Sequence, residues 1–415
     1  MKVLAYTSPA RGHLYPIVPV LAELQRRAHR VSLWALPSEV PAMRELGIDA
    51  HPTAAAIGQI ELDDYKGRTR MTKGTRALAT FLARAEHELV DLQDAIAKVK
   101  PDAVLIDINC WGAAVAAELA GVPWAMFSPY LLPLPSRQAP PYGLGLAPAR
   151  SRLGSARDAL AYPLARAIID RTVMPGVDAL RRRQGLPQLR RFRELLSQPQ
   201  LLLVLTVEGF EYPRGDWPEN VRFVGAVNWS PTDPLDATDQ MADPLVLVTC
   251  STERQLDERL IEVALEALPP AGISVLATTG DVHDPDRFAA PSGSRVVGFA
   301  SHEPILARAA CVICHGGMGI TQKALAAGVP VVVVPFGRDQ FETAQRVKAA
   351  GAGVHLSARR LTAPRLLEAV EQALRLRPGA ERIGRAYAAA GGAMAAADAI
   401  EALALTGEGA PEARR

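Results

Sequence analysis

The sequence has few cysteines, almost no net charge and no long apolar run. Four cysteines in 415 residues cannot form a disulfide scaffold. A total of 46 basic against 44 acidic residues leaves a formal charge of +2, too balanced for binding nucleic acid or anionic membranes through net charge. No apolar stretch reaches the ~18 residues of a membrane-spanning helix, and the first residues turn polar without the apolar segment of a signal peptide. We therefore expect a cytoplasmic protein without stable membrane insertion that acts on small molecules.

The chain instead alternates short β-rich runs with helical patterns, and it does so in two halves. Such alternation predicts an α/β fold with a parallel sheet covered by helices on both faces, here in two doubly wound, Rossmann-like domains. The expected strands of the first half cover residues 3–7, 31–36, 103–107 and 124–127, with a weaker run at 48–51. Those of the second half cover residues 245–249, 273–278, 296–299, 310–314 and 329–335.

The domain boundaries follow from composition. A stretch with Pro231, Pro234 and several Asp lacks apolar periodicity and predicts a linker between the domains. The expected parts are residues 1–228 for the first domain, 229–243 for the linker, 244–380 for the second domain, and 381–415 for a C-terminal helix that packs back on the first domain and ends in a disordered tail.

Two long segments interrupt the first domain, at residues 51–73 and 130–150. The second is apolar and rich in proline, so it is either a ligand-binding wall or a mobile surface loop. As a binding wall it would offer Tyr130, Leu132 and Tyr142 to a hydrophobic ligand. The arginine-rich residues 181–193 are interpreted as the solvated face of a helix that ends near Gly185 and Pro187.

The most informative stretch is residues 314–321, with the sequence CHGGMGIT, which ends an apolar run and begins a helical pattern. A strand that passes through a glycine-rich turn into a helix presents free N–H groups to a phosphate-bearing ligand. The same region matches the C-x-x-C-H pattern of covalent haem attachment at Cys311, Cys314 and His315. That interpretation requires export, so both cysteines are taken as small buried residues of a strand.

The topology of a doubly wound sheet brings distant residues together. With the strand order 3-2-1-4-5, the first and fourth strands are neighbours, and ligands bind at their carboxyl ends. His13 follows the first strand and Asp107 ends the fourth, which predicts an imidazole beside a carboxylate. Such a pair can remove a proton from a hydroxyl, although a loop histidine bonded to backbone has the same sequence signature. The absence of G-x-G-x-x-G after the first strand argues against a dinucleotide cofactor.

The same argument applies to the second half. Its first strand ends before Ser251 and Thr252, and its fourth ends at His315 and the glycine turn. Two hydroxyls, an imidazole and a helix N-terminus would surround one anion, which predicts a diphosphate site that can stabilise a leaving group without metal.

These residues resemble those of family 1 glycosyltransferases with the GT-B fold, which transfer sugars from nucleotide sugars to hydrophobic natural products. The resemblance covers nearly the whole chain and is most specific between residues 296 and 346. There the family pattern is present as H-x-G-x-G from His315 to Gly319, A-x-x-x-G-V-P-x-V-x-x-P from Ala324 to Pro335, and the pair Asp339 and Gln340. The resemblance implies two domains facing a central cleft.

The resemblance also implies a role for each matching residue. His13 would be the general base and Asp107 its partner, and the displacement would invert the anomeric centre without metal or cofactor. Asp339 and Gln340 would bind the sugar hydroxyls. The remaining donor contacts would come from Ser251, Thr252, Phe299, Ala300, His315, Gly317, Gly319 and Ile320. Hydroxyl-binding groups favour UDP-glucose over a dTDP-deoxysugar as the donor, with a hydroxyl of a macrolide, polyketide or phenolic compound as the acceptor.

The chain departs from the family pattern at three places among the residues that would bind the nucleotide-sugar donor. Ile320 stands where many relatives have Thr, Ser301 and His302 replace a usual Pro-Gln, and Lys323 replaces the ribose-binding Glu.

Two other functions stay open at this point: a nucleotide-sugar epimerase of the same architecture, and a non-catalytic helper protein. Asp284 and Asp286 mimic a D-x-D metal motif but are interpreted as a turn, so no metal ligand is predicted.

Overall fold

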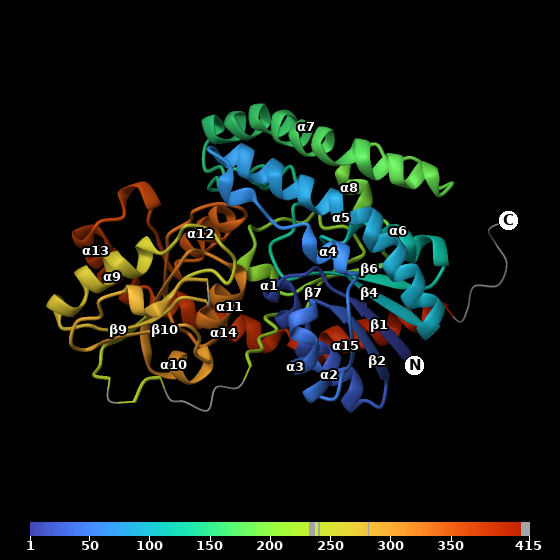
Figure 1. Ribbon diagram of the computed structural model, residues 1–415. Helices are drawn as coiled ribbons and strands as arrows, with labels where there is room; N and C mark the ends of the chain where they lie inside the picture. Colours follow the sequence, from blue (N-terminus) through green and yellow to red (C-terminus); the bar gives the residue numbers. More distant parts are fainter. Residues whose placement is uncertain (232–236, 240, 281, 408–415) are drawn as a thin grey trace.

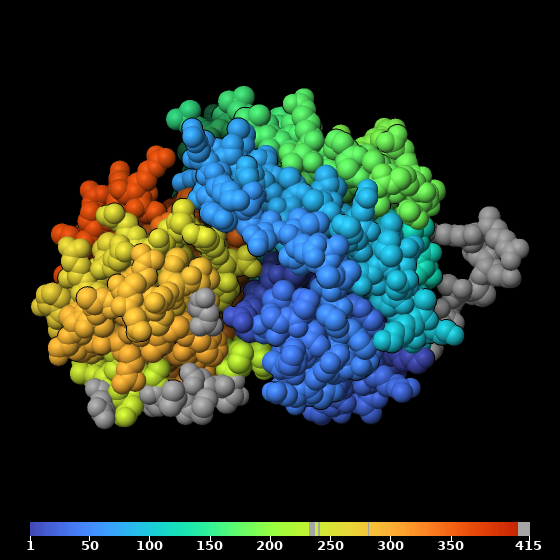
Figure 2. Space-filling model, in the orientation of Figure 1, coloured from blue at the N-terminus to red at the C-terminus, as the bar shows by residue number. Residues whose placement is uncertain are grey.

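The computed structural model contains two α/β domains side by side, each built on a parallel sheet (Figure 1). It describes residues 1–231, 237–239, 241–280 and 282–407. Residues 232–236 and 240 of the predicted linker, and the predicted tail from residue 408 onward, lie outside the described residues. The space-filling view is hollowed between the two lobes, with the N-terminal segment in dark blue at the bottom of the hollow (Figure 2).

The first sheet has the order β3-β2-β1-β4-β5-β6-β7 with every described pair parallel. The predicted order of the first five strands is therefore confirmed, and two further short strands extend the sheet beyond β5. Its strands are β1 Lys2–Tyr6, β2 Arg30–Ala35, β3 Asp49–Pro52, β4 Ala103–Asp107, β5 Trp124–Ser128, β6 Leu201–Val204 and β7 Val221–Phe223.

Helices cover both faces of this sheet, and two of them are long. The helix α5 (Arg70–Val99) begins with Thr69, whose side chain accepts from the Thr72 N–H and forms a capping box with it. The helix α7 (Arg152–Arg183) contains two prolines, and both helices lie along the top of the molecule in Figure 1. The others are α1 Arg11–Leu14, α2 Val18–Arg26, α3 Val40–Glu45, α4 Ala55–Gln59, α6 Trp111–Ala120 and α8 Phe192–Leu195.

The interpretation of residues 181–193 as a solvated helix face is wrong at Arg181. Helix α7 does end at Arg183, and Gly185 follows with a positive φ of 73°. The Arg181 side chain, however, is only 1% exposed and forms an ion pair with Glu118 of α6, with Nη1 2.5 Å from Oε2. Its Nε also donates to the Pro187 carbonyl. Burial is tolerated because the guanidinium is paired and hydrogen-bonded.

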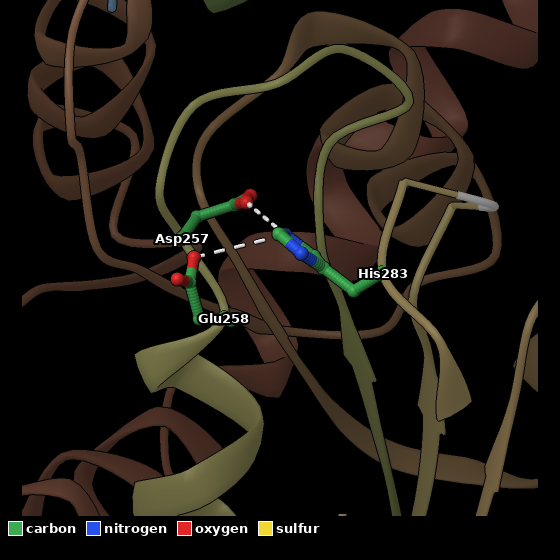
Figure 3. Close-up of side chains that lie close together, drawn as sticks. All are labelled: Asp257, Glu258 and His283. Atoms are coloured by element: carbon green, nitrogen blue, oxygen red, sulfur yellow. Dashed lines mark ion pairs between the residues drawn. The ribbon is translucent and has the colours of Figure 1, made fainter. Parts of the chain in front are cut away.

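The second sheet has the order β10-β9-β8-β11-β12-β13, again with parallel pairs. Its strands are β8 Leu245–Thr249, β9 Ser274–Thr278, β10 Ser294–Val297, β11 Ala309–Cys314, β12 Val331–Val333 and β13 Gly353–His355. The helices of this domain are α9 Arg259–Ala267, α10 His302–Arg308, α11 Met318–Ala326, α12 Gln340–Ala349, α13 Ala363–Leu374 and α14 Arg377–Ala389. The segment after β9 carries His283 toward Asp257 and Glu258, which immediately precede α9 (Figure 3).

The last helix, α15 (Gly392–Gly407), returns to the first domain and packs on α2 and the strands β4 to β6. Its Ala396, Ala397, Ile400 and Leu403 join the core on that face of the sheet. The stretch Arg377–Leu405 has the length and hydropathy of a membrane-spanning helix, the single such stretch among the described residues. It is divided at Gly391 and Gly392, both with positive φ, and its apolar side chains contribute to the cores of the two domains.

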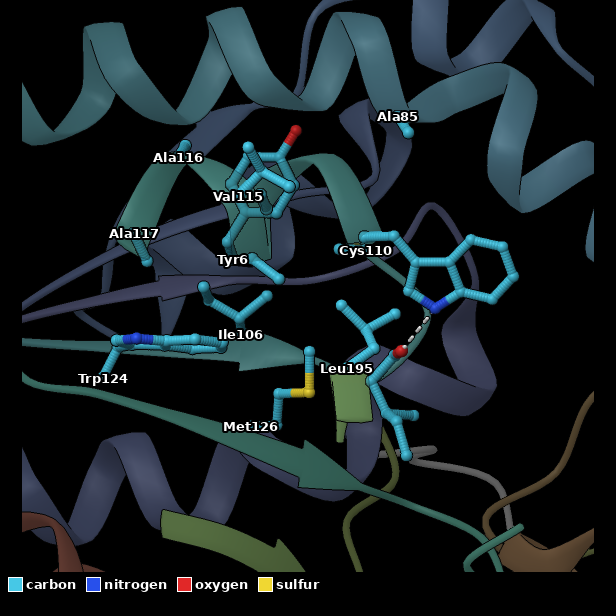
Figure 4. Packing of buried hydrophobic residues seen from close by; sticks show 14 of the residues in the cluster. Tyr6, Ala85, Ile106, Cys110, Val115, Ala116, Ala117, Trp124, Met126 and Leu195 are labelled. Carbon is cyan, nitrogen blue, oxygen red and sulfur yellow. Dashed lines mark hydrogen bonds between the residues drawn. The ribbon is translucent and has the colours of Figure 1, made fainter. Parts of the chain in front are cut away.

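The core on the opposite face of the first sheet determines how closely α5 and α6 approach. Tyr6, Ile106 and Trp124 of the strands pack against residues 115–117 of α6 (Figure 4). A Cβ atom added to Gly112 of α6 would lie 1.7 Å from the Ala85 carbonyl oxygen of α5. The two helices therefore make backbone contact, which glycine alone permits at this position.

We expect Gly112→Ala to destabilise the protein by about 2 to 3 kcal/mol, because the rigid Ala85 backbone must move to admit a methyl group. Gly58→Ala is the matched control, since Gly58 lies in helix α4 with no atom within 4 Å of the added Cβ. It should be neutral or stabilising by up to ~1 kcal/mol. Urea denaturation of both variants measures the difference, and equal stabilities would contradict the close helix contact.

Candidate active site

The carboxyl ends of β1 and β4 bring His13 and Asp107 together, as the topology predicts. His13 lies on the short helix α1 after β1, and its Nδ1 is 2.7 Å from Asp107 Oδ2. An ionised carboxylate only accepts hydrogen bonds, so Nδ1 carries the proton and donates it. Nε2 then carries the lone pair, which can accept a proton from a ligand that displaces its long contact with the Asn109 side-chain nitrogen, at 3.4 Å.

Asp107 is completely buried, and its oxygens accept two more hydrogen bonds. The Ser8 hydroxyl donates to Oδ2 at 3.1 Å, and the Asn109 backbone N–H donates to Oδ1 at 2.8 Å. These contacts satisfy a buried charge that would otherwise be costly. They also fix the carboxylate, and through it the orientation of the imidazole.

Carboxylates of both domains raise the pKa of His13. Burial lowers the pKa of His13, but Asp107 raises it most among the charged groups, followed by Glu253 and Asp339 of the second domain. The net pKa lies above the usual 6.5. Glu253 and Asp339 belong to the second domain, so charges of both domains favour the protonated imidazole.

Asn109 is a residue of this site that the sequence analysis missed. Its side-chain nitrogen lies 3.4 Å from His13 Nε2, and its oxygen accepts a 2.7 Å hydrogen bond from the Tyr130 hydroxyl. The Tyr130 ring packs edge-on against the imidazole, with centroids 5.7 Å apart. The signal that could have found Asn109 is its place two residues after the end of β4.

The predicted acceptor-binding residues have different surroundings. Tyr130 lies beside His13, and Tyr142 is half-buried with a hydroxyl that has no hydrogen-bond partner among the described residues. Leu132, in contrast, is only 2% exposed and packs in the first-domain core. Its neighbour Leu131 packs into the core of the second domain, so this apolar segment joins the two domains.

On the second domain, His315 and two glycines connect β11 to α11. Gly316 has a φ of 96°, which favours glycine, and a Cβ on Gly317 would overlap the imidazole of His315. Gly319 has open space around it, and Ile320 packs partly against the core. The first N–H groups of α11 have no partners within the helix, so this turn can accept an anion.

His315 is 7% exposed, and its surroundings favour the neutral imidazole. Burial lowers its pKa, and the nearby Arg338 lowers it further, although Asp257 acts in the opposite direction. A neutral imidazole can donate one N–H to a phosphate oxygen without the desolvation cost of a buried cation.

Gln340, one of the two predicted sugar-binding residues, contacts other protein groups through both ends of its side-chain amide. Its oxygen accepts from the N–H groups of Phe336 and Gly337 at 2.7 and 2.9 Å, and its nitrogen donates to Gln255. Gln255 in turn donates to the Ser251 hydroxyl at 3.0 Å. Gln340 therefore fixes the loop before α12. The Ser251 hydroxyl accepts from Gln255, so its own proton can be donated to a ligand. The neighbouring Thr252 is exposed.

Asp339, the residue before α12, remains available for a ligand. Burial raises its pKa, whereas Arg338 and His13 lower it. Arg338 itself has an unusual positive φ of 51° and binds Asp64 of the first domain through both Nε and Nη2, at 2.9 and 2.8 Å. The sequence analysis missed this pair, which closes the segment 51–73 onto the donor-side loop.

Three further residues on the donor side, Phe299, Ala300 and Lys323, differ in their surroundings. Phe299 is 39% exposed and Ala300 is buried. Lys323 donates to the Trp229 carbonyl at 2.9 Å and to the Ser230 hydroxyl, so it holds the start of the linker. Burial lowers its pKa to about 8, and burial together with Lys323 lowers the pKa of His302 to about 3.

Two groups of residues contain possible metal ligands: the triplet from Asp284 to Asp286, and Asp257 with Glu258 and His283. Asp284 Oδ1 accepts from the Asp286 N–H at the start of a 3-10 turn, which confirms that this triplet is a turn. Asp257, Glu258 and His283 form a group of possible metal ligands that the sequence analysis did not identify.

Comparison with known proteins shows the family to which the chain is similar. Residues 263–397 match the family model of the erythromycin biosynthesis protein CIII-like C-terminal domain. The chain is similar to 4'-demethylrebeccamycin synthase of Lentzea aerocolonigenes, with 34% identity over 97% of this chain and 99% of that protein.

Two solved structures show the same fold. The calicheamicin glycosyltransferase CalG4 superposes with a TM-score of 0.72 at 22% identity and covers 99% of each chain. The glycosyltransferase VinC in complex with dTDP gives 0.72 at 22% identity, over 98% of this chain and 100% of that one.

Fold and comparisons define a glycosyltransferase of the GT-B architecture. The chain belongs to family 1 of these enzymes, the natural-product type, as the sequence resemblance indicated. The epimerase alternative depended on the two-domain architecture alone, and the assignment to a glycosyltransferase family accounts for that architecture.

The His13–Asp107 pair predicts a specific pH dependence. A general base must be neutral, so kcat/KM should fall as pH drops through the His13 pKa, above 6.5 in the wild type. Asp107→Asn removes the largest charged contribution that raises this pKa, so its acidic limb should move to lower pH, with a moderate loss of rate. His13→Ala should lose about 10² to 10⁴ in kcat.

Rates of transfer measured from pH 5 to 9 test this prediction, with donor binding by calorimetry alongside. His87→Ala, at an exposed position of α5, is the matched control and should behave as wild type. An unmoved limb in Asp107→Asn, or equal losses of donor affinity in both site variants, would contradict the assigned roles.

Proposed function

We propose that the protein is an inverting, metal-independent glycosyltransferase in which His13 is the general base. The observation that carries this proposal is the 2.7 Å contact between His13 and the fully buried Asp107, which places the lone pair of the imidazole on Nε2. The Asp339 carboxylate also raises the pKa of this imidazole, which supports a donor sugar bound between the two groups.

In the proposed reaction, His13 Nε2 takes the proton of an acceptor hydroxyl. The acceptor oxygen attacks the anomeric carbon from the side opposite the diphosphate, and the bond from that carbon to the diphosphate oxygen breaks. Asp107 stabilises the imidazolium that forms, while the Asn109 and Tyr130 side chains hold the ring in place. One displacement inverts the anomeric configuration.

The leaving diphosphate would be held by the turn before α11. Free N–H groups at a helix N-terminus, the neutral imidazole of His315 and the Ser251 hydroxyl are all donors. Preorganised donors of this kind stabilise charge that develops as the bond breaks, in the place that a metal ion takes in other transferases.

For the donor we propose a nucleoside diphosphate hexose, with UDP-glucose favoured. Asp339 supplies a carboxylate for sugar hydroxyls, and a deoxysugar would leave such a buried group unpaired. Because Gln340 is engaged by the protein, this argument rests on Asp339. The alternative is a dTDP-deoxysugar, which is supported by the dTDP bound to the structural neighbour VinC.

We propose a hydrophobic natural product or xenobiotic with a free hydroxyl as the acceptor. Tyr130 and Tyr142 supply aromatic surface beside the base, and the name of the rebeccamycin relative fits such a compound. The four cysteines are free and buried, which supports the cytoplasmic location expected from the sequence.

Activity should survive chelation. With saturating donor and acceptor, kcat after dialysis against EDTA should remain within about twofold of the untreated value, because N–H groups rather than a cation stabilise the diphosphate. Product formation by mass spectrometry, with and without added Mg²⁺ or Mn²⁺, measures this. A strict requirement for either ion would overturn the proposed leaving-group site.

The donor assignment predicts that kcat/KM for UDP-glucose exceeds that for a dTDP-6-deoxyhexose by at least about tenfold, since each unpaired buried polar group costs roughly 1 to 3 kcal/mol. dTDP-glucose separates the effect of the base from that of the sugar. Asp339→Asn should reduce the discrimination between the two hexoses. A tenfold preference of the wild type for the 6-deoxy donor would show that the hydroxyl argument is wrong.

A further inference from the structure

Asp257, Glu258 and His283 form a compact group outside the catalytic pair. Asp257 and Glu258 immediately precede α9, and His283 comes from the segment after β9, so the imidazole points between the two carboxylates (Figure 3). His283 Nε2 lies 3.8 Å from Asp257 Oδ1 and 3.7 Å from Glu258 Oε2. One ligand atom from each residue lies within 4.8 Å of the others.

The three facing atoms have no hydrogen-bond partner among the described residues. Asp257 Oδ1, Glu258 Oε2 and His283 Nε2 are each buried and without a partner. The side chains of Asp257, His283 and Glu258 are 1%, 9% and 25% exposed, and the facing oxygen of Glu258 is itself buried, so solvent does not satisfy these atoms. The distances of 3.7 and 3.8 Å exceed a normal hydrogen bond. Leaving such groups unmatched is costly, and a cation among them would remove the cost.

The ligand types select the kind of cation. One imidazole nitrogen and two carboxylate oxygens suit a divalent transition metal, zinc above all, whereas calcium and magnesium prefer all-oxygen sites. Zinc binds these atoms at about 2.0 to 2.2 Å, which places tetrahedral ligand atoms some 3.5 Å apart. The observed separations are a few tenths of an ångström to about one ångström larger, within reach of small side-chain rotations.

We propose that Asp257, Glu258 and His283 bind one divalent transition-metal ion, with zinc as the preferred species. The ion would be a structural clamp. Asp257 uses its other oxygen, Oδ2, to accept from the Ser251 N–H at 2.7 Å, and that oxygen is 3.8 Å from His315 Nδ1. The ion would bind Oδ1 of this carboxylate and take no part in the displacement. The Ser251 N–H contact with Oδ2 does not require the ion, so the chelation result expected for kcat is unchanged.

The test uses the full chain, stripped of metal and free of affinity tags, with Zn²⁺ alone as the probe. We expect one zinc per chain and an increase in melting temperature with added Zn²⁺. Glu258→Gln and His283→Ala should each weaken zinc affinity at least about tenfold, as measured by competition with a chromophoric chelator. Mg²⁺ and Ca²⁺ at the same concentration should leave the melting temperature unchanged.

His87→Ala is the matched control, because it removes an exposed histidine from α5 and should retain wild-type zinc affinity. Glu258→Gln preserves side-chain size, so the proposal stays testable if His283→Ala does not fold. The proposal is overturned if the wild type binds no zinc, if Glu258→Gln binds zinc as tightly as the wild type, or if Mg²⁺ or Ca²⁺ stabilises the protein more than Zn²⁺. No nucleotide sugar is present, so these outcomes are independent of the proposed transferase activity.

Discussion

The pairing of β1 with β4 and of β8 with β11 is the constraint on which this structure depends. In each sheet the order reverses at this pair, and parallel strands bring both carboxyl ends to one edge. His13 and Asp107 meet at the first edge, and Ser251 and His315 lie at the second. Any change in strand order would separate residues that are more than 60 positions apart in the chain, so the chemistry depends on topology before it depends on side-chain geometry.

Charge holds the two domains together near this site. Arg338 binds Asp64, Glu342 accepts from the N–H groups of Gly143 and Gly145 at 2.9 and 2.7 Å, and Arg346 bridges Glu342 and Glu211. Each carboxylate faces a cation or an N–H group, so burial is compensated. The segments 51–73 and 130–150, which interrupt the first domain in sequence, supply much of this contact. They therefore act as domain-joining segments as well as neighbours of the substrate site.

The sequence predicted those parts of the structure that depend on local pattern and on topology. The strands up to β5 and the contact between His13 and Asp107 followed from apolar runs and the strand order. The length of α7 did not, because Pro163 and Pro175 interrupt its pattern. Contacts between side chains that are distant in sequence could not be predicted either. Arg181 is buried because it forms an ion pair with Glu118, and the Gln340 amide is engaged because Gln255 accepts a hydrogen bond from it. Asp257, Glu258 and His283 come from two segments, and their spacing along the chain matches no known metal-binding motif.

The return of α15 to the first domain has a consequence for how the protein is made. Arg27 and His29 bind Glu401, and the apolar face of α15 covers the strands β4 to β6 on one side of the first sheet, beside α2. A ribosome releases the N-terminal residues first, yet this face is completed only when the last helix emerges. The second domain, whose strands lie between residues 245 and 355, can assemble earlier. The first domain is thus completed only after the strands of the second domain have been synthesised, and until then β4 to β6 lack part of their apolar cover.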